Sequence, residues 1–113
     1  MNIKKTLFEN IIERKIPASI VYEDEKIIAF KDINPISEGH VLVVPKKFSR
    51  NLLTIKDDIL AYLMVKSVEI AKIIIKQKGV DGFRLHVNNE KSSEQVVFHT
   101  HVHIIPSRKG DPK

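Results

Sequence analysis

We predict an α+β fold in which an antiparallel sheet of about five strands carries one long and one short helix. Three observations predict it: one long amphipathic stretch, five short runs rich in β-branched and aromatic residues, and short turn-like connections between most of these runs. Connections this short favour hairpins over the crossovers that a parallel sheet requires. No repeat, linker or change of composition marks a boundary, so we expect residues 1–113 to form a single domain.

The spacing of apolar residues predicts two helices. The first covers Leu7–Arg14, and Pro17 prevents it from continuing. The second covers Asp57–Lys78, with an apolar stripe on one face and mostly charged residues on the other. Thr54 and Asp57 resemble a capping box at its start, and Gly79 is well placed as its C-terminal stop.

Five strands are predicted from short β-type runs bounded by turn residues. The charged corner at residues 23–25 predicts a hairpin between the first two runs, and Pro45 is expected to end the third. The predicted strands are Ser19–Asp24, Lys26–Lys31, His40–Val44, Gly82–Asn89 and Phe98–Pro106.

Composition excludes several classes of protein. The chain has no cysteine, which excludes disulfides, thiolate catalysis and cysteine-bound metals and favours the cytoplasm. The longest apolar run, Ile59–Val65, is far shorter than the ~20 residues of a membrane span, and we expect neither a membrane segment nor a signal peptide. The net charge of +5 suits an anionic ligand such as phosphate. Because the basic pairs are scattered and aromatic residues are few, we expect no dedicated nucleic-acid binding.

The alternating histidines His99, His101 and His103 are the clearest sign of chemistry. If they belong to a strand, their rings stand in a row on one face, about 6–7 Å apart. Neutral imidazoles in such a row need hydrogen-bond partners, and two interpretations remain open. Two of them can ligate a metal with a third ligand from elsewhere. Alternatively, the middle imidazole attacks a phosphorus atom while a flanking histidine and backbone N–H groups of residues 92–95 hold the phosphoryl oxygens.

The segment His99–Ile105 resembles the H-x-H-x-H signature, followed by apolar residues, of the histidine triad family. Other blocks of the chain are similar to blocks of that family in order and spacing, from about Phe8 to Gly110. The resemblance is closest to the histidine triad nucleotide-binding proteins of the phosphoramidase branch. The matching blocks are Ile16–Ala18 with Val21–Asp24, Ala29–Pro35, Gly39–Lys47, and Gly82–Leu85 with Asn88 and Asn89.

This resemblance implies a HIT-like fold, a homodimer, and hydrolysis of purine nucleoside 5'-phosphoramidates without a cofactor. It implies that His101 is the nucleophile that forms a nucleotidyl-histidine, that His99 and His103 support it, and that His40 lies near the phosphate. By the same resemblance, Asn88 and Gln95 contact the phosphate and leaving group, and Asp32 accepts the ribose hydroxyls. The apolar walls around base and ribose correspond to Phe8, Ile11, Ile16, Phe30, Ile33 and Leu42.

The chain departs from the family at a structural zinc site. Many similar bacterial proteins bind zinc through a C-x-x-C pair, a further histidine and the first histidine of the triad. Thr6 and Glu9 stand here in place of the cysteines and Phe48 in place of the histidine. Since His99 alone cannot hold the metal, we predict no structural zinc.

A second departure lies next to Gln95. Glu94 replaces a small residue, which is expected to close off a backbone conformation, and Val96, at a leaving-group position, cannot donate or accept a hydrogen bond. An acidic Glu94 also favours substrates with amine-bearing leaving groups. The alternatives are a nucleotide-binding or scaffold protein with little turnover, a histidine-based metalloenzyme, and a dinucleoside polyphosphate hydrolase of the same family.

Overall fold

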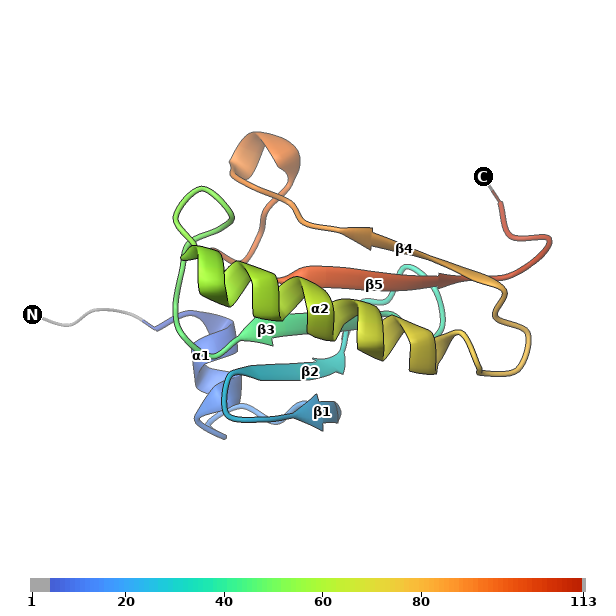
Figure 1. Ribbon diagram of the computed structural model, residues 1–113, viewed down its shortest axis with the longest axis horizontal. Coiled ribbons are helices and arrows are strands. Elements are labelled where there is room, and N and C mark those ends of the chain that lie inside the picture. The colour runs from blue at the N-terminus through green and yellow to red at the C-terminus, as the bar shows by residue number, and fades with distance from the viewer. Residues whose placement is uncertain (1–4, 113) are drawn as a thin grey trace, which may run out of the picture.

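The computed structural model describes residues 5–112 and contains a five-stranded antiparallel sheet of strand order β1-β2-β3-β5-β4 (Figure 1). The predicted α+β class is confirmed. Its strands are β1 (Ile20–Glu23), β2 (Ile27–Lys31), β3 (Val41–Pro45), β4 (Gly82–His86) and β5 (Val102–Ser107). Its helices are α1 (Leu7–Ile12), α2 (Asp57–Ile74) and a short 3₁₀ turn, η1 (Lys91–Ser93).

Strands β2 and β3 are buried on both faces because each face carries its own helix. Residues such as Ala29 and Val43 belong to the core cluster formed with α2, which lies across the sheet in Figure 1. Their neighbours Phe30 and Leu42 face the other way and pack with Phe8 of α1. This explains why both runs are continuously apolar instead of alternating. The smaller cluster under α1 forms the floor of the site described below.

Both predicted boundaries of α2 need correction. The N-cap is Lys56, which makes no side-chain capping bond, and the hydroxyl of Thr54 donates to the carbonyl of Asn51 instead. A complete capping box occurs at α1, where Thr6 and Glu9 bond reciprocally. At its other end α2 stops at Ile74, and the next residues continue with tighter i to i+3 bonds. Gly79 lies beyond this turn, with a φ of +82°, and does not terminate the helix.

The strand boundaries also differ from the prediction, most of them by one residue and two by more. Pro45 belongs to β3 and pairs with Ile27, since a proline at the last position of a strand removes no essential ladder bond. β4 ends at His86, before Asn89, and β5 begins only at Val102. The segment before Val102 is not in the sheet because Thr100 is hydrogen-bonded to the loop residue Ser49 instead. Both the backbone N–H and the hydroxyl of Thr100 take part in these bonds. The three histidines are therefore not a regular row on one strand.

Within residues 5–112, no helix has the length and apolar character that crossing a membrane requires. The edges of the sheet are β1 and β4.

Candidate active site

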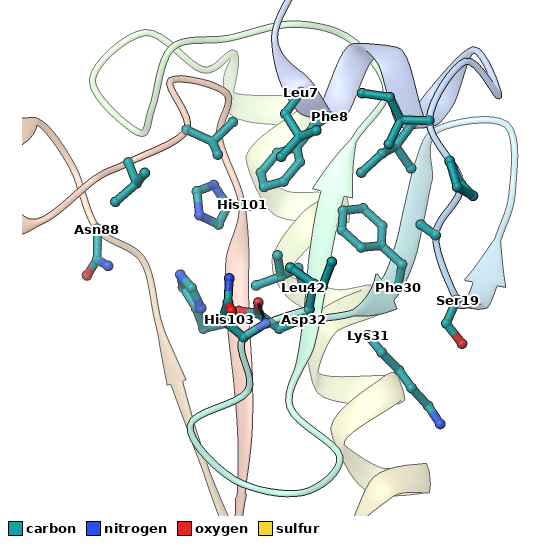
Figure 2. A pocket seen from close by; sticks show the side chains of 18 of the residues that line it. Leu7, Phe8, Ser19, Phe30, Lys31, Asp32, Leu42, Asn88, His101 and His103 are labelled. Carbon is teal, nitrogen blue, oxygen red and sulfur yellow. Dashed lines mark hydrogen bonds between the residues drawn. The ribbon is translucent and has the colours of Figure 1, made fainter.

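A cavity of about 850 Å³ opens between α1, the ends of β2 and β3, and the segment that leads into β5 (Figure 2). One end is apolar and is built on the buried rings of Phe8 and Phe30, which meet edge to face at 5.5 Å. The other end is polar and contains Asp32, His101 and His103. The predicted site residues that line the cavity are Phe8, Ile11, Ile16, Phe30, Asp32, Ile33, Leu42, Asn88, Val96, His101 and His103. The cavity thus combines an apolar slot with a histidine-rich polar end.

His101 is held with one nitrogen free. Its Nδ1 lies 2.7 Å from the carbonyl oxygen of His99, and since a carbonyl can only accept, Nδ1 carries the proton. Nε2 of the neutral ring then holds an unshared electron pair. Burial is the main cause that lowers the pKa of His101, and it outweighs the raising effect of the His99 carbonyl. Phe8 packs edge to face on the ring at 4.8 Å. His101 is therefore a neutral, oriented imidazole whose Nε2 has an electron pair available for nucleophilic attack.

His103 and His40 are linked in a chain whose proton positions are also fixed. The backbone N–H of Ile36 donates to Nδ1 of His40, so the other nitrogen of His40, Nε2, carries the proton. That Nε2 lies 2.9 Å from Nδ1 of His103, which accepts, and leaves His103 with its own proton on Nε2. Burial and the neighbouring histidines lower the pKa of His103 to about 3. Neutral His103 can therefore donate a hydrogen bond through Nε2.

His86 completes the cluster, and its part in it was missed from the sequence. Its ring lies 4.6 Å from the ring of His103, because His86 on β4 pairs directly with His103 on β5. All five histidines of the chain consequently gather at this site. The strand register that brings His86 to His103 is a long-range pairing, and its position two residues before Asn88 is the only local signal.

Gln95, predicted as a phosphate or leaving-group contact, lies outside the cavity and is buried in the loop. Its side-chain oxygen accepts from Asn51 and from the backbone of Glu90, and its nitrogen donates to the carbonyls of Arg50 and Val97. The amide is thus fully hydrogen-bonded within the protein. We call these four residues with Gln95 the loop anchor. It fastens the β4–β5 connection to the segment that follows β3.

Glu94 adopts the left-handed conformation, with φ of +66° and ψ of +28°. The expectation that a glutamate here closes off that backbone conformation is therefore wrong. The preceding 3₁₀ turn and the bond from the N–H of Glu94 to the carbonyl of Lys91 hold the backbone in place. Glu94 lines the cavity, as do several residues that the sequence did not single out: Leu7, Pro17, Ala18, Ser19, Lys31, Asn34 and Val97.

Comparison with known proteins identifies the family. The model of the HIT domain matches residues 13–110. This chain belongs to the HIT domain family. An uncharacterized 13.1 kDa HIT-like protein of Mesomycoplasma hyorhinis is 54% identical and covers 96% of this chain and 97% of its own length. An adenylylsulfatase of Arabidopsis thaliana, HINT1, is 35% identical over 92% of this chain and 72% of its own length.

Solved HIT structures share the fold. A HIT-like protein from Bartonella henselae superposes with a TM-score of 0.90 at 43% identity, over 93% of this chain and 81% of its own. A hypothetical histidine triad nucleotide-binding protein from Sulfolobus tokodaii does so with a TM-score of 0.83 at 47% identity, over 92% of this chain and 70% of its own. The chain thus falls in a superfamily of nucleotide-binding hydrolases.

At the position of the HIT zinc site, the structure brings together the residues that stand in place of the ligands. The hydroxyl of Thr6 lies 3.1 Å from Nδ1 of His99, and the ring of Phe48 lies 5.4 Å from that of His99. Nε2 of His99 lies 2.8 Å from the carbonyl of Pro45, so both ring nitrogens are in use. A hydroxyl and a phenyl ring do not suit zinc, which prefers thiolate and imidazole ligands, and the carboxylate of Glu9 already accepts the N–H of Thr6. These residues do not fit the metal.

A second group of side chains is close enough together to hold a cation. Ligand atoms of Asp32, His40 and His103 lie within 4.8 Å of one another. A neutral histidine that ligates through Nε2 must carry its proton on Nδ1. In His40, however, Nδ1 accepts the N–H of Ile36 and has no room for that proton. This group therefore fits the hydrogen-bonded chain described above better than it fits a metal.

Proposed function

We propose that this protein hydrolyses purine nucleoside 5'-phosphoramidates through a covalent intermediate on His101. The observation that carries the proposal is the orientation of His101. Its Nδ1–H donates to the His99 carbonyl, so Nε2 is unprotonated and lies at the wall of the cavity. A neutral imidazole is a nucleophile at phosphorus near neutral pH. Lowering its pKa keeps it in that form.

The two ends of the cavity suit the two parts of a nucleotide. A purine fits between the apolar walls around Phe8 and Phe30, where it replaces water on their surfaces. Asp32 lies between this end and the histidines (Figure 2). Its carboxylate accepts one backbone N–H, from Asn34, and keeps further lone pairs for two ribose hydroxyls.

The phosphoryl group then lies at the polar end. Nε2–H of His103 and the amide of Asn88 are the donors for its oxygens, since both residues line the cavity beside His101. The chain from Ile36 through His40 keeps the proton of His103 on the nitrogen that can donate. His40 is thus a positioning residue in this proposal, and so is His99.

In the first step the electron pair of His101 Nε2 forms a bond to phosphorus. The P–N bond of the substrate breaks, and its electron pair stays on the leaving amine, which takes up a proton. The ring becomes positively charged, and the His99 carbonyl at Nδ1 stabilises that charge. In the second step water attacks phosphorus and the P–Nε2 bond breaks. The net reaction consumes one water and yields a nucleoside monophosphate and an amine.

Steady-state hydrolysis of an adenosine 5'-phosphoramidate by the wild type and by His101→Ala, each with and without EDTA, tests the proposal. We expect turnover by the wild type that resists EDTA, and a loss of at least about 10³-fold in His101→Ala. Acid-quenched enzyme should carry a nucleotide label on His101. Activity abolished by EDTA would instead support a metalloenzyme. Tight binding of AMP without turnover would support a nucleotide-binding protein.

Two other substrates belong in the same assay. Adenylyl sulfate, in which sulfate replaces the amine, is a second candidate substrate, because one relative is named as an adenylylsulfatase. A dinucleoside polyphosphate would place a second nucleotide at the leaving-group position. Covalent attack by His101 is the same for all three, so the ranking of kcat/KM values identifies the preferred leaving group.

We also infer that two copies associate. β4 is an edge of the sheet, and its residues Phe83 and Leu85 pack only partly into the core beneath α2. On α2 itself, Val65 and Val68 lie one turn apart and are 58% and 36% exposed. A second copy could cover these apolar side chains and pair with the strand edge.

A further inference from the structure

A second groove of about 750 Å³ continues from the proposed nucleotide cavity. Three residues, Asn88, Glu94 and Val96, line both spaces, so the groove and the cavity meet at these side chains. Lys91, Gln95 and Phe98 line only the groove. If the nucleoside occupies the apolar end of the cavity, the groove is the space into which a substituent on phosphorus can extend.

Glu94 carries the charge at the junction of the two spaces. Its side chain forms no hydrogen bond or ion pair with another residue in the range 5–112. Glu90, four residues earlier, is different because Arg50 binds its carboxylate through two nitrogens and Asn51 through a third. Of the two carboxylates in this loop, Glu90 and Glu94, the unneutralised one is therefore that of Glu94, which lies where the cavity and the groove meet.

The position of Glu94 is fixed even though its side chain is exposed. Its N–H bonds to Lys91, and the next residue, Gln95, is held by four hydrogen bonds of the loop anchor. The Cβ of Glu94 is thus presented at a constant place on the rim. The other charged residue of the groove, Lys91, does not line the nucleotide cavity and so lies farther from the phosphorus.

We propose that Glu94 determines leaving-group specificity by favouring amines that carry a further positive charge. The proposal rests on the proposed function, since it assigns the groove to the leaving group. A carboxylate attracts a cation in the groove and repels an anion such as sulfate. Glu94 is a specificity-determining residue here and takes no part in bond breaking.

The experiment compares three compounds of graded leaving-group charge: adenosine 5'-phosphoramidates of pentylamine and of 1,5-diaminopentane, and adenylyl sulfate. The measured quantity is the ratio of kcat/KM between the diamine and pentylamine compounds. Because an exposed ion pair is a weak interaction, we expect Glu94→Gln to lower this ratio about two- to fivefold. The same variant should raise kcat/KM for adenylyl sulfate. Both effects should shrink at high salt.

Lys91→Gln is the matched control, because it removes a charge of opposite sign from the same groove. It should leave the ratio unchanged or raise it. Glu94→Gly separates charge from conformation, since glycine adopts the left-handed backbone freely. It should change the ratio as Glu94→Gln does. An unchanged ratio in both Glu94 variants, with hydrolysis intact, would overturn the proposal.

Failure of the proposed function gives a different result. If the wild type does not turn over the phosphoramidates, their dissociation constants still report on Glu94. They can be measured by calorimetry on His101→Ala, which cannot form the covalent intermediate. A diamine compound that binds more tightly than the pentylamine compound, with the difference lost in Glu94→Gln, supports the role of Glu94. Equal affinities would reject it.

Discussion

At the scale of single residues, the histidine cluster shows how backbone groups choose protonation states. The carbonyls of His99 and Pro45 fix the protons of His101 and His99. The N–H of Ile36 fixes the proton of His40 and, through His40, that of His103. In each case the backbone group can only donate or only accept. Without these hydrogen bonds the four imidazole rings would interconvert between their two tautomers. The nitrogen that faces the substrate is thus set by the fold.

This cluster predicts a stability that depends on pH below the usual pKa of histidine. The pKa values of His40, His99, His101 and His103 are all lowered, chiefly by burial. The unfolded chain therefore binds more protons than the folded one once the pH falls below about 6.5, and the free energy of unfolding must decrease there. Urea unfolding at pH 7.0 and at pH 5.0 measures this.

The same comparison in His103→Asn provides the control. His103 has a pKa lowered to about 3, so at pH 5 its ring is still neutral in the folded protein while it is mostly protonated in the unfolded chain, and its contribution is already partly lost there. The variant should show a smaller decrease between the two pH values than the wild type. Carboxylates with lowered pKa values, such as Asp24 and Glu90, lose their contribution only at more acidic pH and do not confuse the result. Equal stability of the wild type at both pH values would contradict the prediction.

At the scale of elements, α1 depends on Thr6. Its hydroxyl accepts from the N–H of Glu9 and donates to His99, so one side chain caps the helix and holds the first histidine of the triad. Thr6→Val keeps the shape and removes both bonds. We expect a loss of about 1–2 kcal/mol in the free energy of unfolding, by denaturant titration. Thr6→Ser should retain most of the stability, and equal losses in both would mean that the methyl group matters instead.

The loop anchor makes a second prediction at this scale. Gln95→Ala removes one of the two acceptors of the Asn51 amide and leaves the backbone N–H of Glu90 without its acceptor, and we expect a loss of about 2–3 kcal/mol. The kcat/KM for the phosphoramidate should fall as well, because the loop also carries Val96. Val96→Ala is the control. Since Val96 is 85% exposed, its truncation should change stability by less than about 0.5 kcal/mol.

Elements with local signals could be predicted from the sequence. The apolar periodicity of α2 and the buried runs of β2 and β3 indicated their type and approximate extent. The end of β4 and the start of β5 could not be predicted, because the bonds between Thr100 and Ser49 join residues far apart in sequence. For the same reason the prediction that the three histidines form a row on one strand was wrong, although two of the three line the cavity.

The site was predicted in outline where a motif carried it. The resemblance identified the residues of the apolar walls together with Asp32 and His101, and the structure brings them to one cavity. It did not indicate the place of His86, which depends on the register of two strands. Nor could it reveal that the amide of Gln95 is hydrogen-bonded within the protein, since two of its partners, Arg50 and Asn51, lie more than 40 residues away in the sequence.

At the scale of the whole molecule, the inferred association of two copies uses the edge strand β4 and the exposed Val65 and Val68 of α2. If two copies associate there, Val68→Lys should place a charge in the interface and shift the protein from dimer to monomer. Light scattering with size-exclusion chromatography measures the mass. The exposed Leu53→Lys is a matched control away from α2 and should not alter the mass. A wild type that is monomeric at high micromolar concentration would reject the dimer.

The bonds around His99 have a consequence for protein engineering. Building a zinc centre like that of the similar bacterial proteins requires Thr6→Cys, Glu9→Cys and Phe48→His. Yet Thr6 and Glu9 are also the two halves of the capping box that begins α1. Grafting the metal would therefore dismantle the existing start of this helix, and His99 would have to give up at least one of its two present partners. The redesigned protein would exchange a helix start that is always present for one that exists only when the metal is supplied.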